Sequence, residues 1–320
     1  MNQAHNLKLT ILALLGGTLT AAARYPDAVK PVNIDSSKDG SQQPALFFAP
    51  EADGPVPLLV ALHTWSSGWQ NTYNVPLAKG CIERKWAFIH PDFRGPNKHP
   101  EACGSDLAVA DIIDAVAWAK TNTRIDVQRI YLAGTSGGGH MALLMAGKAP
   151  EIWAGVSAWV PISDCAAWHM QCLKSGRRYH ADLEKSCGGK PGDTPEIDAQ
   201  YRRRSPLTWL KQAVNVPLDI NAGIHDGHQG SVPISHSLRA FNILANEKDR
   251  LSELHIAHFT DRSGVPETLV HPIKIDAAYG EKRQPLWRGE SNRVRVTIFN
   301  GNHEMIPEAI FAWLNRQRKP

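Results

Sequence analysis

The stretch that decides the fold runs from Ile130 to Met141 and reads Ile-Tyr-Leu-Ala-Gly-Thr-Ser-Gly-Gly-Gly-His-Met. A short apolar run typical of a buried strand leads directly into Gly-x-Ser-x-Gly, and a helix-forming segment follows. In this context the serine lies on a tight turn between a strand and a helix, where the flanking glycines let neighbouring backbone approach closely. The N-terminal N–H groups of that helix face any anion formed beside the serine. The pattern predicts that Ser136 is a nucleophile and that the Gly137 N–H is an oxyanion-hole donor.

A glycine-rich turn before a helix can also hold a phosphate group, so a nucleotide site is the alternative for this segment. The Walker lysine and the dinucleotide-binding glycine spacing are both missing from it. The strand-turn-helix context therefore favours the nucleophile.

A serine hydroxyl needs a histidine base and an orienting carboxylate, which should follow it in the order serine, acid, histidine. Asp226 comes just after a predicted strand at 216–220, and His303 comes just after another at 294–299. Catalytic groups of open α/β sheets gather at the carboxyl ends of strands, so we expect these two side chains to meet there. Asp226 could instead form a turn or cap a helix, and His303 could be a neighbour of a helix start. Glu304 is a rival acid, but its adjacency to His303 makes it a poor partner for that imidazole.

The oxyanion hole needs a second backbone donor. We expect it from the loop after the predicted strand 56–63, with Trp65 as the first choice and Thr64 as the second. Trp65 could equally be a packing residue, because tryptophan is usually buried.

Short apolar runs alternate with amphipathic segments along the chain, which indicates an α/β fold with a mostly parallel sheet flanked by helices. Strands are predicted over 45–48, 56–63, 86–90, 130–133, 154–160, 216–220 and 294–299. Helices are predicted over 106–121, 137–146, 231–245 and 306–316.

Two stretches break this alternation within a domain that we assign to residues 24–320. Residues 161–213 are predicted to form a cap insertion after a strand. Residues 246–292 are predicted to be a substrate-cleft insertion, because a long loop in a compact domain is usually functional. Trp287 and Arg288 near its end are candidate substrate contacts.

The first 23 residues have the pattern of a secretory signal peptide. Lys8 precedes an apolar run, and Ala21 to Ala23 form a small-residue cleavage site. The run is shorter than the roughly 20 apolar residues that span a bilayer, so we expect no membrane anchor and a secreted or periplasmic protein. A retained N-terminal helix is the alternative.

Composition narrows the choice of partners. The 320 residues carry a formal net charge of +4 without a block of Lys or Arg, so no nucleic-acid partner is expected. No cofactor or metal is expected, because the five cysteines show no zinc spacing. In an oxidising compartment those cysteines should form one or two disulfides, with Cys81–Cys103 and a pair drawn from Cys165, Cys172 and Cys187 as our prediction.

Four further motifs support a family resemblance: Asp92-Phe93-Arg94-Gly95, Arg204-Ser205-Pro206, His225-Asp226-Gly227 and Val232-Pro233. With the serine turn they lie within residues 45–315, and the chain resembles the catalytic domain of prolyl-oligopeptidase-type hydrolases and related esterases. The resemblance implies the α/β-hydrolase fold, the same triad order, and hydrolysis of esters or peptides through an acyl-enzyme.

The sequence departs from that family in three places. No β-propeller segment precedes the catalytic region, the oxyanion segment reads His63-Thr64-Trp65 instead of His-Gly-Gly, and the spacing from Asp226 to Val232-Pro233 is long. Single-domain secreted relatives of this kind resemble acetylxylan and feruloyl esterases. We therefore expect a secreted carboxylic-ester hydrolase acting on small-molecule esters or on acetyl or feruloyl esters of polysaccharides. The alternatives are a serine peptidase, a polyester depolymerase and a non-catalytic binding protein, and the oligomeric state stays open.

Overall fold

A nine-stranded sheet runs through the part of the chain that the computed structural model describes, residues 24–262 and 264–319. The strand order is β1-β2-β4-β3-β5-β6-β7-β9-β8. Neighbours from β4 to β9 are parallel, and β1, β2 and β8 join antiparallel at the two edges. The strands are β1 Lys30–Asp35, β2 Gln42–Phe48, β3 Val56–Leu62, β4 Ala87–Pro91, β5 Ile125–Thr135, β6 Gly155–Trp159, β7 Leu218–Gly223, β8 Pro285–Ser291 and β9 Val294–Phe299. The predicted, mostly parallel α/β sheet is confirmed, and the predicted signal peptide lies outside the described residues.

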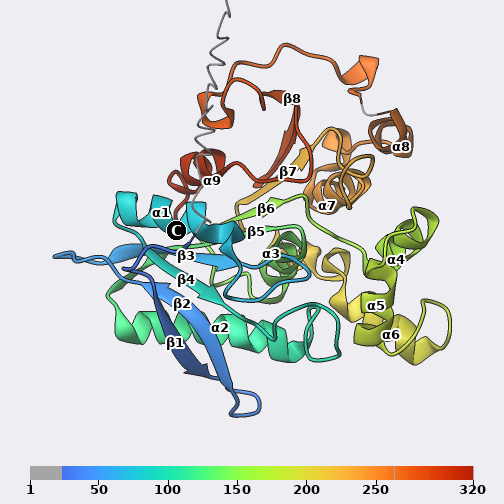
Figure 1. The fold of residues 1–320 in the computed structure, drawn as a ribbon. Coiled ribbons are helices and arrows are strands. Elements are labelled where there is room, and N and C mark those ends of the chain that lie inside the picture. Colours follow the sequence, from blue (N-terminus) through green and yellow to red (C-terminus); the bar gives the residue numbers. More distant parts are fainter. Residues whose placement is uncertain (1–23, 263, 320) are drawn as a thin grey trace, which may run out of the picture.

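Helices cover both faces of the sheet (Figure 1). Strand β3 is buried at every position, because Leu58 and Val60 face one hydrophobic cluster while Leu59 and Ala61 face the other. The first cluster includes residues of α2 Asp106–Asn122, α3 Gly137–Lys148, α7 Ser235–Leu244 and α8 Glu253–Arg262, and the second includes residues of α1 Val75–Arg84 and α9 Pro307–Leu314. Among the described helices none has the length and apolar character to cross a membrane.

Parallel pairing of β7 with β9 brings two distant loops together. Gly223 is paired with Phe299 at the carboxyl ends of the two strands. Beyond that point the Ile224 N–H donates to the Phe299 carbonyl at 2.8 Å, and the His225 N–H donates to the Gly301 carbonyl at 3.1 Å. A Cβ atom on Gly223 would lie 2.1 Å from the Asn302 carbonyl oxygen, so this approach requires glycine. The loops after β7 and β9 therefore leave the sheet side by side.

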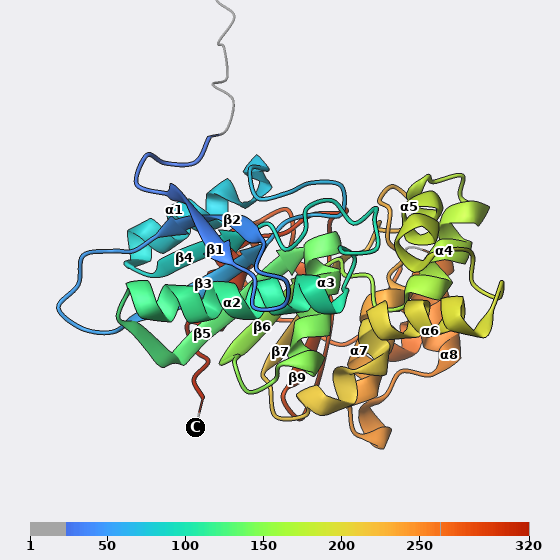
Figure 2. The ribbon, with the colours of Figure 1, turned by 90° about the horizontal axis from the view of Figure 1, so that it is seen from below.

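The predicted cap segment, residues 161–213, forms three helices grouped beyond one end of the sheet (Figures 1 and 2). They are α4 Cys165–Lys174, α5 Tyr179–Cys187 and α6 Pro195–Arg204, followed by the 3₁₀ turns η2 Pro206–Thr208 and η3 Leu210–Ala213. A separate hydrophobic cluster joins them to the body through Trp65 and Val232. The Arg204 guanidinium also donates to the carbonyls of Pro100, Ala102 and Cys103, which ties the cap to the loop before α2.

The disulfide prediction is wrong for this structure. All five cysteines are buried free thiols. Cys81 lies on α1 in the same cluster as α9, whereas Cys103 lies in the cap cluster with Cys165. Proximity in sequence therefore misled the pairing, because the two residues face different hydrophobic clusters.

The segment 246–292 was expected to be an insertion at the substrate cleft, but it adds an edge strand to the sheet. It contains α8, short 3₁₀ turns and β8, which pairs antiparallel with β9. Trp287 is buried in the main core and contacts Phe259, with ring centroids 5.4 Å apart. Arg288 pairs with Asp276 at 3.0 Å. Both candidate substrate contacts thus support the edge of the sheet.

Candidate active site

Ser136 occupies the strained turn that the sequence predicts between β5 and α3. Its backbone has φ 59° and ψ −116°, a conformation that non-glycine residues adopt rarely. The turn is held because the Ser136 N–H donates to Trp159 O at 2.9 Å and its carbonyl accepts from His140 N at 2.8 Å. A Cβ on Gly134 would lie 2.2 Å from the Gly138 carbonyl oxygen, which explains the two outer glycines of the motif.

The predicted acid and base lie in contact. His303 Nδ1 and Asp226 Oδ2 are 2.8 Å apart, and the carboxylate is 1% exposed. Its other oxygen accepts from the N–H groups of Gly227 at 2.9 Å and Val232 at 3.1 Å. The residues from Asp226 to Val232 therefore form a closed loop around the carboxylate, which accounts for the long spacing between them.

The rival acid is engaged elsewhere. Glu304 forms an ion pair with Arg283 at 2.6 Å and accepts from the Asn302 N–H at 3.2 Å. Among the described residues, Asp226 is the carboxylate that contacts the His303 imidazole.

Trp65 lies directly against the residue after the serine. A Cβ on Gly137 would lie 2.4 Å from the Trp65 backbone nitrogen, so the two backbones are in close contact. The Trp65 indole is also buried, packs on Trp168 with centroids 4.7 Å apart, and donates to Asp182 at 3.2 Å. The packing interpretation of Trp65 is confirmed for its side chain. Its backbone nitrogen lies beside Gly137, and its role as an oxyanion donor stays a prediction. Thr64, the second choice, bonds through its hydroxyl to Ser67 at 2.9 Å.

Two residues of the Asp-Phe-Arg-Gly motif hold this oxyanion loop in place. The His63 imidazole contacts the Asp92 carbonyl at 2.6 Å and stacks on Phe93, with ring centroids 3.8 Å apart. Asp92 Oδ1 accepts from the Trp69 N–H at 2.9 Å. Burial lowers the pKa of His63, in keeping with an imidazole whose role is to support the loop.

A hollow of about 600 Å³ opens beside His303. Its lining comprises Ser66 from the oxyanion loop, four cap residues and four residues near the acid and base: Ser66, Arg177, Arg178, Tyr179, Asp182, Gln229, Gly230, Ser231 and His303. The Arg177 guanidinium donates to the Gly230 carbonyl, which joins the cap to the loop after the acid. The oxyanion loop, the cap and the candidate base therefore face one space.

Ser231 is a site residue that sequence reasoning missed. Its Oγ lies 3.4 Å from His303 Nε2, the nitrogen opposite the bond to Asp226. No motif marks it, and its place becomes visible only when the loop between Asp226 and Val232 is closed.

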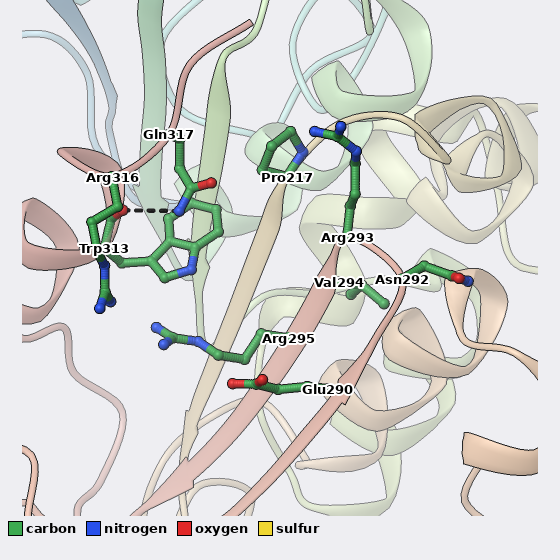
Figure 3. A pocket seen from close by; sticks show the side chains of 9 residues that line it. All are labelled: Pro217, Glu290, Asn292, Arg293, Val294, Arg295, Trp313, Arg316 and Gln317. Carbon is green, nitrogen blue, oxygen red and sulfur yellow. Dashed lines mark hydrogen bonds between the residues drawn. The ribbon is translucent and has the colours of Figure 1, made fainter. Parts of the chain in front are cut away.

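A second hollow, of about 410 Å³, lies at the opposite ends of β7 and β9 (Figure 3). Its lining is cationic, with Arg293 and Arg316 exposed and Arg295 engaged by its neighbours. Arg295 pairs with the buried Asp219 at 2.8 Å and lies over Trp313, 5.8 Å from the ring centroid. This hollow contains neither a histidine nor a serine in its lining, and it carries no candidate triad.

Comparison with known proteins connects this geometry to one family. Residues 105–261, which include the serine turn, the cap and the acid, match the prolyl oligopeptidase family. Among solved structures, the chain resembles an acylaminoacyl peptidase of Pyrococcus horikoshii at 17% identity and a TM-score of 0.55, covering 68% of this chain and 34% of that one.

Two further peptidases show the same fold. Prolyl oligopeptidase B from Galerina marginata matches at 18% identity and a TM-score of 0.54, over 68% of this chain and 31% of that chain. A puromycin-hydrolyzing peptidase of Mycobacterium tuberculosis matches at 20% identity and a TM-score of 0.54, over 69% and 34%. This chain thus spans about a third of the length of these structures. The chain therefore has the α/β-hydrolase fold, and its residues 105–261 resemble the prolyl oligopeptidase family.

Proposed function

We propose that this chain is a serine peptidase that cleaves peptide bonds through an acyl-enzyme on Ser136. The observation that carries the proposal is the 2.8 Å contact between Asp226 and His303 at the sheet edge where the strained Ser136 turn lies. The prolyl oligopeptidase family and the peptidases named above favour a peptide substrate over the polysaccharide ester expected from the sequence.

The first half of the reaction follows from the orientation of the imidazole. The Nδ1–H group of His303 donates a hydrogen bond to Asp226, which leaves Nε2 as the base. Nε2 takes the Ser136 hydroxyl proton while Oγ attacks the scissile carbonyl carbon. The Gly137 and Trp65 N–H groups stabilise the resulting oxyanion. His303 then gives its proton to the leaving amine as the carbon–nitrogen bond breaks.

The second half repeats the cycle with water. His303 takes a proton from water, the hydroxide attacks the acyl carbon, and the ester bond to Ser136 Oγ breaks as Oγ regains a proton. Ser231 Oγ is a weak partner of Nε2 at 3.4 Å, and Ser136 Oγ replaces it when the substrate is bound. Catalytic hydrogen bonds often tighten only in the substrate complex.

The lining of the hollow supports a short peptide as substrate. Arg177 and Arg178 bring guanidinium groups to its wall, and Asp182 brings a carboxylate. Guanidinium groups bind carboxylates and carbonyl oxygens, and a carboxylate binds an ammonium group. A peptide carries all of these partners, whereas an acetyl ester carries only the carbonyl oxygen.

The test uses substrate pairs that share one acyl group. Short N-acylated peptides would be offered as the 4-nitroanilide and as the 4-nitrophenyl ester, with Ser136→Ala as the control. We expect the wild type to cleave both members of a pair and Ser136→Ala to cleave neither. Ester turnover without anilide cleavage for every peptide would overturn the peptidase proposal and return the ester hydrolase to first place.

A folded protein that turns over neither substrate requires a second readout. Labelling with a fluorophosphonate reports whether Ser136 is activated, independent of substrate choice. A labelled but inactive protein would point to a different acyl group. An unlabelled protein would favour the binding-protein alternative.

A further inference from the structure

Two helices of the cap bring three metal-ligand side chains together outside the triad. His169 lies on α4, and His180 and Glu184 lie one turn apart on α5. His169 Nε2 is 2.8 Å from Glu184 Oε1, and His180 Nδ1 is 3.4 Å from the same oxygen. All three ligand atoms lie within 4.8 Å of one another.

The spacing of these atoms suits one small cation. Zinc binds imidazole nitrogen at about 2.0–2.1 Å and carboxylate oxygen at about 2.0–2.2 Å, usually in a tetrahedron. Ligand atoms at such distances lie roughly 3.4 Å apart around a tetrahedral ion. The contacts of His180 and His169 to Glu184, at 3.4 and 2.8 Å, are within about 0.6 Å of that separation, and the two imidazole nitrogens lie within 4.8 Å of each other.

Packing holds the key ligand before any ion binds. His169 is 1% exposed, and its ring packs edge-on against His180 and Tyr201 with centroids 5.9 and 6.0 Å apart. Its Nδ1 has no hydrogen-bond partner among the described residues, so packing and the contact at Nε2 fix the ring. His180 and Glu184 are half-buried, which leaves a route for an ion from solvent.

An ordinary ion pair between α4 and α5 would need one histidine and one carboxylate. Here a second imidazole is aimed at the same carboxylate oxygen. Two histidines with one glutamate form a set that is known to bind zinc with a fourth position open to water.

We propose that His169, His180 and Glu184 bind one divalent transition metal ion, with zinc as the ion that best fits this ligand set. The ion joins α4 to α5. Because α5 also brings Tyr179 and Asp182 to the hollow beside His303, the bound ion stiffens one wall of that hollow. The site lies outside the proposed triad, so we assign the ion no step in the proposed acyl transfer.

The test measures binding of the metal alone to the full chain. Protein treated with EDTA and dialysed would be titrated with zinc chloride by calorimetry, and with Co²⁺ by visible absorption of the tetrahedral ion. We expect one equivalent to bind to the wild type. Glu184→Gln and His180→Gln should each weaken binding at least about 100-fold, the upper end of what loss of even an outer-shell partner costs.

Matched controls separate this site from other ligands on the chain. Glu196→Gln on the neighbouring α6 and His271→Gln, both exposed, should bind zinc like the wild type. Circular dichroism without metal checks that each variant is folded, and two independent ligand variants guard against one that is not. The proposal is overturned if the wild type binds no single equivalent, or if both ligand variants keep its affinity.

A further outcome would overturn the assignment in a specific way. If His303→Ala alone abolishes the one-equivalent binding, the metal is held at the hollow and not between α4 and α5. None of these readouts uses catalytic turnover, so failure of the metal site and failure of the proposed peptidase activity are distinguishable.

Discussion

The two ends of β7 and β9 each border a hollow, and the two hollows differ in how their charged groups are engaged. At the carboxyl ends, Asp226 and His303 bond to each other, and within the described part of the chain Nε2 of the imidazole has only the weak Ser231 contact. At the amino ends, the Arg295 guanidinium is engaged by the buried Asp219 and by the Trp313 ring (Figure 3). The first hollow therefore has a titratable group with an atom available for a substrate, whereas the arginine of the second is engaged by its neighbours.

Ser136→Ala is expected to have the largest effect on activity at the carboxyl ends of the strands. It removes the proposed nucleophile and should lower kcat by about 10⁴- to 10⁶-fold. Steady-state rates on the 4-nitrophenyl esters measure the effect. The exposed Ser37→Ala is the control and should keep wild-type rates. A loss smaller than about 100-fold would mean that another group attacks the substrate.

The next effect comes from Asp226→Asn, for which we expect kcat to fall by about 10⁴-fold, because the amide no longer fixes the imidazole tautomer. The matched control is Asp219→Asn, a buried aspartate on β7, the strand that precedes the Asp226 loop. Rates per folded molecule should be near normal for that control. Equal losses in both variants would show that the effect is one of folding.

At the amino ends, Arg295→Ala should affect stability and leave the chemistry intact. It leaves the buried Asp219 without its cation, which typically costs about 3–5 kcal/mol. We expect the free energy of unfolding, measured with urea, to fall by about 3 kcal/mol, the low end of that range. The loss stays at the low end because Ser157 and Asn221 still donate to Asp219. Arg293 is an exposed arginine of the same hollow, and Arg293→Ala should change the free energy of unfolding by less than about 0.5 kcal/mol. A kcat/KM change in either variant at temperatures where it is folded would contradict the assignment.

A Gly137→Ala substitution tests the oxyanion contact. The added methyl would lie 2.4 Å from the Trp65 nitrogen, so the two backbones must separate. We expect kcat to fall by about 10²- to 10³-fold, the loss typical of one oxyanion donor. Gly54→Ala, whose added Cβ meets nothing within 4 Å, is the control. Full activity of Gly137→Ala would remove this pair from the mechanism.

The last prediction concerns acid sensitivity, which we assign to buried imidazoles. Burial lowers the pKa of His140 and His236 to about 4 and that of His90 to about 3. Because the unfolded chain takes up these protons near pH 6.5, stability should be complete above pH 6.5 and fall as the pH drops towards 4. Each histidine contributes up to about 1.4 kcal/mol per pH unit in that window.

Urea unfolding at pH 7, 6 and 5 measures this slope. His140→Gln, which can keep a donor to the Arg204 carbonyl, should reduce it by about 1.4 kcal/mol per unit. The exposed His271→Gln should leave it unchanged. An unaltered slope in His140→Gln would mean that its proton uptake does not differ between the folded and unfolded states.

The sequence predicts well what depends on local pattern and on strand direction. The Ser136 turn is encoded by adjacent glycines, and the meeting of Asp226 with His303 follows because parallel strands end at one edge. It fails where contacts depend on long-range packing. Trp287 was assigned to a cleft because its segment was interpreted as a long functional loop, yet it lies on β8, which pairs with β9. Ser231 carries no motif, so only the folded loop reveals it.

The separation of the candidate triad from the cap also bears on how this protein can change through evolution. The candidate triad and both proposed oxyanion donors lie outside residues 161–213, whereas Arg177, Arg178, Tyr179 and Asp182 of that segment line the hollow. Mutations in the cap can therefore alter which substrates enter the hollow, while the proposed reacting groups stay unchanged. The limit on such divergence is the Arg204 anchor, because a replacement cap must supply an equivalent partner for the carbonyls of Pro100, Ala102 and Cys103.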